Sequence, residues 1–169
     1  MMKFFSVCLF VIMVLLAGCK VGFNFSGGGA VDPRLQTISI DNFTNEAAVV
    51  VPYLAQEVTQ QMQDRFLNQS RLKLTSGDAD LRINGAITRY QVSPVAISGD
   101  TRAEQSRLTI AVRVSFENTI EPADSWENTF SKFIDFDATL DFSSIERDQI
   151  NEVLEQITQD VFTKSVAKW

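Results

Sequence analysis

The chain has 169 residues, a formal net charge of −6 and no histidine. The absence of histidine excludes Ser-His and Cys-His nucleophilic catalysis and histidine-based zinc sites. The acidic balance argues against a nucleic-acid partner, because proteins that bind nucleic acids neutralise the phosphates with lysine and arginine.

The first residues have the pattern of a bacterial lipoprotein signal. Lys3 supplies a positive charge, and residues 4–16 are an uncharged apolar run, which is shorter than the roughly 20 residues that a helix needs to span a bilayer. The run ends in Leu-Ala-Gly-Cys at positions 16–19, which matches the lipobox. We therefore expect residues 1–18 to be a signal peptide that is removed, and Cys19 to carry a diacylglycerol. A short uncleaved anchor with an incidental cysteine is the alternative.

Lipidation would account for both cysteines of the chain. Cys8 leaves with the signal and Cys19 carries the lipid, so the mature protein has no thiol for a disulfide, a metal or catalysis. Without Lys3, 14 Lys and Arg stand against 21 Asp and Glu, a net charge of −7. Residues 19–34 contain three consecutive glycines and are expected to form a flexible tether. Residues 35–169 have the size of one domain.

The first elements of this domain are a strand and a helix. Residues 35–43 alternate apolar and polar side chains, which predicts a strand that ends near Phe43. Residues 52–69 predict an amphipathic helix with Pro52 in its first turn. Its apolar stripe recurs every four residues and consists of Leu54, Val58, Met62 and Phe66.

Four further strands are expected, over residues 71–75, 81–92, 106–116 and 125–137. The third of these is the clearest, because five apolar residues share one face: Leu108, Ile110, Val112, Val114 and Phe116. Lys132 shares the apolar parity of the last strand, which predicts a bulge or a register break there.

A second helix closes the domain. Ser143 and Glu146 have the spacing of a capping box, and the helix is expected to run nearly to Trp169. Its apolar stripe consists of Ile150, Val153, Leu154, Ile157 and Val161. The order of strand, helix, four strands and helix predicts an α+β fold. We expect a two-layer sandwich in which a single mixed or antiparallel sheet packs against two amphipathic helices.

Five cations should share the sheet face that points away from the helices. Arginine forks suit phosphate groups, so this face is a candidate binding site for an anionic partner. A solvated face, or the protection of edge strands by charge, is the simpler interpretation. The five residues are Arg71, Lys73, Arg82, Arg107 and Arg113.

Carboxylates are the remaining candidates for chemistry, because two Asp or Glu side chains suffice for glycoside hydrolysis. Asp135, Asp137 and Asp141 come nearest to a cluster. A polar strand face that ends in a turn explains them better. The sequence therefore predicts no enzyme, no cofactor and no metal site.

Four features of the domain carry a resemblance to a known family: the segments "DADLRINGAITRY", "RLTIAVRVSFEN" and "FSKFIDFDA", and a closing helix that ends in tryptophan. Together they resemble the Bacteroidetes form of the LptE family of LPS-assembly lipoproteins. The resemblance covers roughly Ile38 to Trp169. It implies a lipid-anchored protein on the periplasmic side of the outer membrane, which binds the LPS-translocating β-barrel LptD and plugs its lumen.

The resemblance also implies contact with lipopolysaccharide, whose anionic groups would suit the five cations. Residues Gln91–Gln105 are a candidate insert into the barrel, or else an ordinary hairpin connection. The competing hypothesis is an accessory lipoprotein of another envelope complex that makes no contact with LPS.

Overall fold

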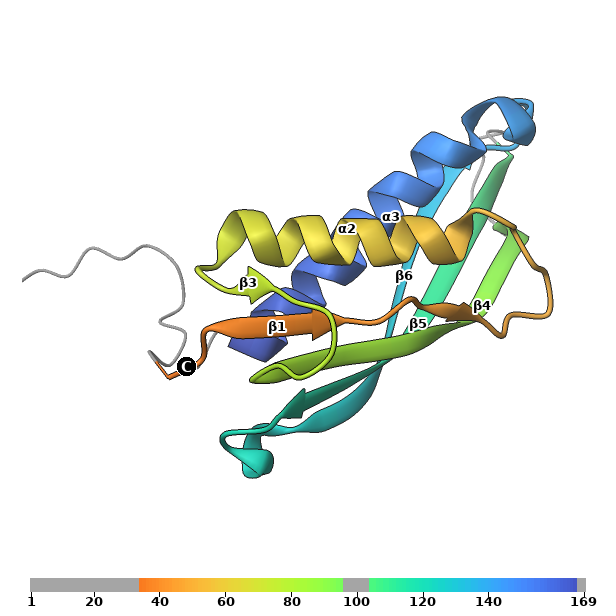
Figure 1. The fold of residues 1–169 in the computed structure, drawn as a ribbon. Helices are drawn as coiled ribbons and strands as arrows, with labels where there is room; N and C mark the ends of the chain where they lie inside the picture. Colours follow the sequence, from red (N-terminus) through yellow and green to blue (C-terminus); the bar gives the residue numbers. More distant parts are fainter. Residues whose placement is uncertain (1–33, 96–103, 167–169) are drawn as a thin grey trace, which may run out of the picture.

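The computed structural model describes residues 34–95 and 104–166. Six strands form one mixed sheet, and two helices pack on one of its faces (Figure 1). The predicted α+β fold is therefore confirmed. No helix in the described part is long and apolar enough to cross a bilayer. The predictions for the signal peptide, for Cys19 and for most of the tether lie outside the described residues.

The sheet has the order β3-β1-β4-β5-β6, and β2 pairs with β4 beyond the end of β1. β1 is parallel to β3 and β4, whereas β4, β5 and β6 form an antiparallel meander. The strands are β1 (Thr37–Ile40), β2 (Thr44–Asn45), β3 (Lys73–Leu74), β4 (Leu81–Val95), β5 (Gln105–Asn118) and β6 (Trp126–Asp137).

The first predicted strand ends earlier than expected, at Ile40 and not near Phe43. A separate short strand, β2, begins at Thr44, beyond the predicted range, and pairs with β4 at Ala86 and Ile87. Between β1 and β2 the ring of Phe43 lies on Gly85, where a β-carbon would be 2.6 Å from Phe43 Cε1 and would also meet the carbonyl oxygen of Arg113. Because Gly85 has no side chain, the ring of Phe43 can pack directly against the backbone of β4.

Both helices bury the stripes that their sequences predict. α2 (Leu54–Gln69) begins just after Pro52 and not at it. α3 (Phe142–Val166) follows β6 after a short turn and runs to the last described residue. A short 3-10 helix, η1 (Pro122–Asp124), connects β5 to β6. The fully buried residues of the two stripes are Leu54, Val58, Met62, Phe66, Ile150, Val153, Leu154, Ile157 and Val161.

The break predicted at Lys132 is wrong. The pairing of β5 with β6 is continuous over its whole length. Lys132 keeps the parity of its apolar neighbours because its Nζ lies 2.7 Å from Oδ2 of Asp160 on α3. An ion pair between the layers thus satisfies the inward-facing charge. The irregularity of the sheet lies instead in β4, between Ile87 and Arg89.

Two predictions about loops and caps are also corrected. Asp141 precedes α3, and its carboxylate accepts hydrogen bonds from the amide and the hydroxyl of Ser143. Glu146 accepts a hydrogen bond from Tyr90, so the expected capping box does not form.

Residues Gln91–Val95 continue β4, and Gln105 begins β5. The expected insert is therefore shorter, and its middle lies outside the described residues.

Candidate functional site

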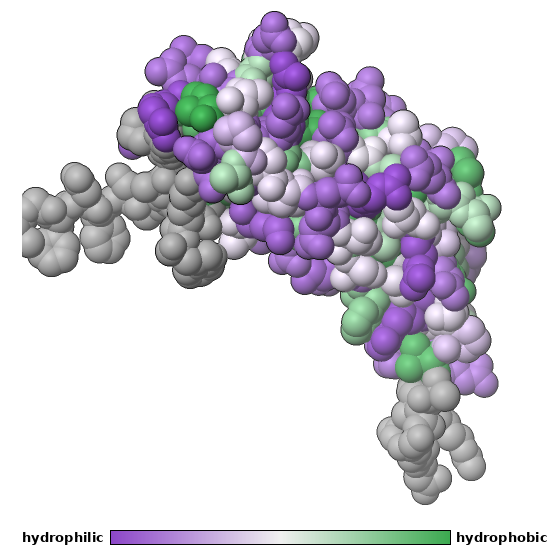
Figure 2. Space-filling view, turned by 90° about the horizontal axis from the view of Figure 1, so that it is seen from below, coloured by the Kyte–Doolittle hydropathy of each residue, from purple (hydrophilic) through white to green (hydrophobic). Residues whose placement is uncertain are grey.

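Strand register brings four of the five predicted cations to the outer face of the sheet, opposite the helices. Lys73 lies beside Thr37, and Arg82 lies beside Ser39 and Glu117. Arg107 and Arg113 lie on β5, where Ser93 and Ala86 of β4 are their neighbours. Seen from below the sheet, the surface is mainly hydrophilic (Figure 2). Alternation along the strands therefore predicted the sheet face of these four side chains correctly.

Arg82 and Arg113 make ion pairs within the domain. Nη2 of Arg82 lies 2.8 Å from Asp78 Oδ1, and Nη1 lies 4.0 Å from Glu117 Oε2. Nη2 of Arg113 lies 2.8 Å from Glu46 Oε2. A ligand phosphate would have to compete with these carboxylates. These pairs favour the simpler interpretation of a solvated face, on which carboxylates of the same domain neutralise the arginines.

Arg107 is held on two sides. Its Nε and Nη2 donate to the two carboxylate oxygens of Asp135 at 2.6 and 2.8 Å, and its guanidinium carbon lies 3.7 Å from the centroid of the Phe133 ring. The hydrogen bond from Arg107 lowers the pKa of Asp135. The side-chain and backbone hydrogen bonds from Thr139 lower the pKa of Asp137. Both carboxylates therefore act as structural acceptors, unlike a general acid, which needs a raised pKa.

Arg71 and Lys73 differ from the other three. The sequence predicted a strand over residues 71–75, but β3 comprises only Lys73 and Leu74, and Arg71 lies in the turn before it. Both residues are exposed, and neither side chain makes an ion pair or a hydrogen bond with any described residue. They lie at the edge of the sheet, because β3 is its outermost strand. The five predicted cations therefore form two groups.

Arg89 is a further cation on the outer face, and the sequence analysis missed it. Simple alternation from Leu81 and Ile83 would point residue 89 towards the helices. The register shift after Ile87 instead places Arg89 opposite Ala111, on the same face as Arg113. Arg89 is exposed and makes no ion pair within the described ranges. The register shift could have been predicted from the sequence, because Arg89 is a charged residue at a position where alternation from Leu81 and Ile83 would require an apolar one.

A hollow of about 450 Å³ lies where the connection between β1 and β2 crosses the outer face. Arg113 contributes to its wall, but so do the carboxylates of Asp41, Glu46 and Glu127. Three acids against one arginine do not suit an anionic ligand. On the outer face of β4 and β5, the cation that remains accessible is therefore Arg89, which does not line this hollow.

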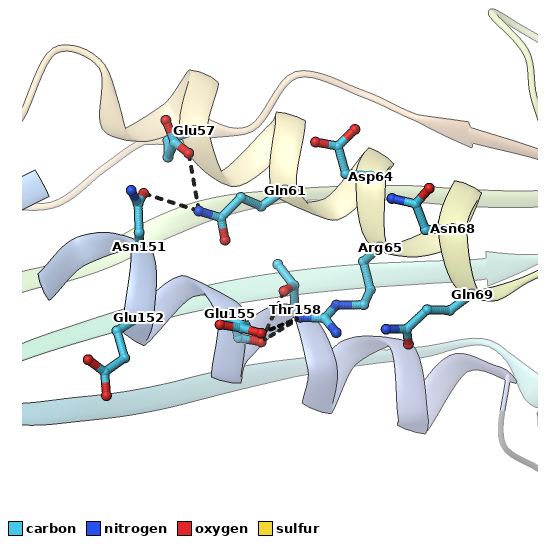
Figure 3. Close-up of a pocket in the computed structure, with 10 residues that line it drawn as sticks. All are labelled: Glu57, Gln61, Asp64, Arg65, Asn68, Gln69, Asn151, Glu152, Glu155 and Thr158. Atoms are coloured by element: carbon cyan, nitrogen blue, oxygen red, sulfur yellow. Dashed lines mark hydrogen bonds and ion pairs between the residues drawn. The ribbon is translucent and has the colours of Figure 1, made fainter. Parts of the chain in front are cut away.

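A second hollow, of about 810 Å³, lies between α2 and α3 (Figure 3). Gln61 Nε2 donates to Glu57 and, across the groove, to Asn151 Oδ1 at 3.2 Å. Arg65 also reaches across, and its Nη1 donates to Gln159 Oε1 at 2.8 Å. These hydrogen bonds join the helices. No group of acidic, cysteine or histidine side chains that could hold a metal ion occurs in the described part of the chain.

Comparison with known proteins identifies the family. A family model described as "LptE: Lipopolysaccharide-assembly" matches residues 35–165. The chain belongs to the LptE family. It is thus a non-enzymatic lipoprotein of lipopolysaccharide assembly at the outer membrane, which confirms the prediction that it is not an enzyme.

Solved structures show the same fold at low sequence identity. The minor lipoprotein from Acinetobacter baumannii aligns with a TM-score of 0.53 and 10% identity, over 79% of this chain and 94% of that chain. The rare lipoprotein B from Shewanella oneidensis aligns with a TM-score of 0.52 and 13% identity, over 78% and 94%. A search of the curated proteins gave no match.

Proposed function

We propose that this LptE-family protein, of the Bacteroidetes form, is anchored through Cys19 to the periplasmic side of the outer membrane and plugs the LPS-translocating barrel LptD. The lipobox supports the anchor, and the family match supports the role in assembly. The lumen of such a barrel is polar and wet. A compact domain with a hydrophilic sheet face on one side and a polar groove between its helices on the other suits that surrounding.

We further propose that the central part of the outer face contacts the anionic groups of lipopolysaccharide. The observation that carries this is Arg89, an exposed cation without an ion pair to any described residue. It is surrounded in register by short side chains such as Ala111 and Ser131, which leave its guanidinium accessible. Arg82, Arg107 and Arg113 would contribute after exchanging their carboxylate partners for phosphates.

The alternative is an accessory role in the envelope without contact to LPS. The ion pairs of Arg82, Arg107 and Arg113 favour it, because they already neutralise these cations. Arg89 distinguishes the two functions by experiment, since only a contact with LPS would make LPS binding depend on its charge.

Affinity purification of the tagged, lipidated chain from outer membranes tests the proposed assembly. Mass spectrometry of the co-purified proteins should find an LptD-type barrel in stoichiometric amount. Recovery of another envelope complex, or of no barrel, contradicts the plug function. Direct binding of purified LPS then tests the contact.

For that binding test Arg89→Glu is compared with Arg89→Lys. We expect the glutamate variant to lose most of the affinity and the lysine variant to retain part of it, since lysine keeps the charge but not the fork. Exposed surface changes of this kind have little effect on folding. Unchanged affinity in Arg89→Glu would contradict a contact through Arg89, whereas no binding of LPS by the parent protein would support the accessory role.

A further inference from the structure

A basic and partly apolar surface lies where α2 ends and β3 begins. We call it the α2–β3 corner and define it as Leu67, Arg71, Lys73 and Leu74. Leu67 is 44% exposed and Leu74 is 38% exposed. β3 lies against α2 and forms the edge of the sheet (Figure 1). Side chains on both faces of this edge strand therefore border the same surface.

The corner carries positive charge that nearby acids do not neutralise. Between Asp64 and Asp78 the chain has three cations and no acid. Arg65 reaches into the helix groove, whereas Arg71 and Lys73 are exposed and make no ion pair with any described residue. Asp78 is paired with Arg82. The corner therefore presents two free cations beside two exposed leucines.

The corner is also the part of the domain that is joined directly to the start of β1. The backbone N–H of Lys73 donates to the carbonyl of Gln36 at 2.8 Å, and Thr37 is its neighbour in register. Cys19 lies 15 residues before Arg34. A flexible chain of that length spans about 20 Å on average and about 50 Å at most.

We propose that the α2–β3 corner rests on the leaflet that holds the lipid anchor, with the leucines at the headgroup boundary and Arg71 and Lys73 on anionic phospholipid headgroups. The inference rests on anchoring at Cys19, as proposed above, and it places this corner at the periplasmic rim of the barrel, outside the lumen that the rest of the domain plugs. Exposed leucines flanked by cations are the composition that binds peripheral proteins to anionic lipid surfaces. The short tether keeps this corner, more than the far end of the sheet, near that surface.

Single-cysteine labelling tests the contact, because the mature chain has no thiol other than the lipidated Cys19. Leu67→Cys, Leu74→Cys and Leu140→Cys are each labelled with bimane in the full lipidated protein. Leu140 is 51% exposed and lies in the turn between β6 and α3, so it is the matched control. The proteins are incorporated into vesicles of phosphatidylcholine and phosphatidylglycerol that contain a brominated lipid. Fluorescence should be quenched at positions 67 and 74 and not at position 140.

Charge reversal identifies the lipid groups that are bound. R71E/K73E should lose the quenching at position 67, as should vesicles without phosphatidylglycerol. Arg147→Glu, at an exposed cation near the start of α3, should retain it. Full quenching in R71E/K73E overturns the assignment to anionic headgroups. Flotation with the vesicles reports the anchor separately. A protein that floats without quenching at 67 and 74 overturns the corner alone, and one that does not float overturns the anchor and the corner together.

Discussion

The hydroxyl of Tyr90 donates a 2.6 Å hydrogen bond to Oε1 of Glu146. Tyr90 is buried on β4, and Glu146 lies in the first turns of α3, so the bond joins the middle of the sheet to the start of the last helix. Burial raises the pKa of Tyr90, and the hydrogen bond to Glu146 raises it further. The phenol therefore remains protonated, and so a hydrogen-bond donor, at neutral pH.

Tyr90→Phe removes this donor without creating a cavity. Hydrogen bonds to charged groups contribute more than neutral ones, so we expect the free energy of unfolding to fall by about 1.5 kcal/mol. Urea denaturation measures it. Tyr53→Phe is the control, because the Tyr53 ring lies under Arg147 and its hydroxyl has no hydrogen bond to a described residue. Equal losses in the two variants would show that the Tyr90 bond contributes nothing particular.

Gly85→Ala should destabilise the domain by overpacking. The new methyl group meets the Phe43 ring and the Arg113 carbonyl, and neither can move without disturbing β2 or β5. We expect a loss of about 1–3 kcal/mol in the free energy of unfolding. Asn84→Ala, at the neighbouring exposed position, should change it by less than about 0.5 kcal/mol. A neutral Gly85→Ala would mean that Phe43 does not lie on the sheet.

The ion pair of Lys132 with Asp160 predicts unequal effects for its two partners. Asp160→Ala leaves a cation among apolar residues of β6 and should cost up to about 1 kcal/mol. Lys132→Met keeps the apolar stem and removes the charge, so its thermal midpoint should stay close to that of the parent. Added salt should reduce the loss in Asp160→Ala relative to the parent, because it screens the pair that only the parent makes. The reverse order of stability would contradict the pairing.

Asp80 should make the stability of the domain depend on pH in the acid range. Its carboxylate accepts hydrogen bonds from the amide of Gln36 and from the amide and hydroxyl of Thr37, which lower its pKa below the usual value of 3.8. The stabilisation is therefore fully present above that value and is lost as the pH falls through the lower folded-state pKa. Asp80→Asn should be less stable than the parent at pH 6. Denaturation curves at pH 6 and pH 2.5 should show the gap closing, and a gap that widens at low pH would contradict the assignment.

Most of the layer arrangement could be predicted from sequence, because a helix or strand with one buried face repeats apolar residues with the period of that helix or strand. The stripe of α2 and the alternation of β5 are each set by one face that packs on the core, and both are buried as expected. Local pattern could not show that β1 ends at Ile40, since the break depends on where β4 offers a glycine for Phe43. The parallel insertion of β1 between β3 and β4 also depends on pairing between distant segments.

The candidate site was predictable in part for the same reason. Parity placed Lys73, Arg82, Arg107 and Arg113 on one face because those strands are regular around them. Arg89 was missed because one residue of β4 interrupts the alternation. The carboxylate partners come from other elements, such as Glu46 after β2, so their effect on the cations could not be foreseen.

β1 is the strand through which any membrane anchor on the tether would be mechanically coupled to the domain. Both of its edges are paired in parallel, with β3 and with β4, and Asp80 fixes its first residues. A pull directed along β1 loads these hydrogen bonds together, in shear, whereas a pull across a hairpin would open them one by one. The domain would therefore resist detachment from its anchor under lateral force better than its few β1 hydrogen bonds suggest.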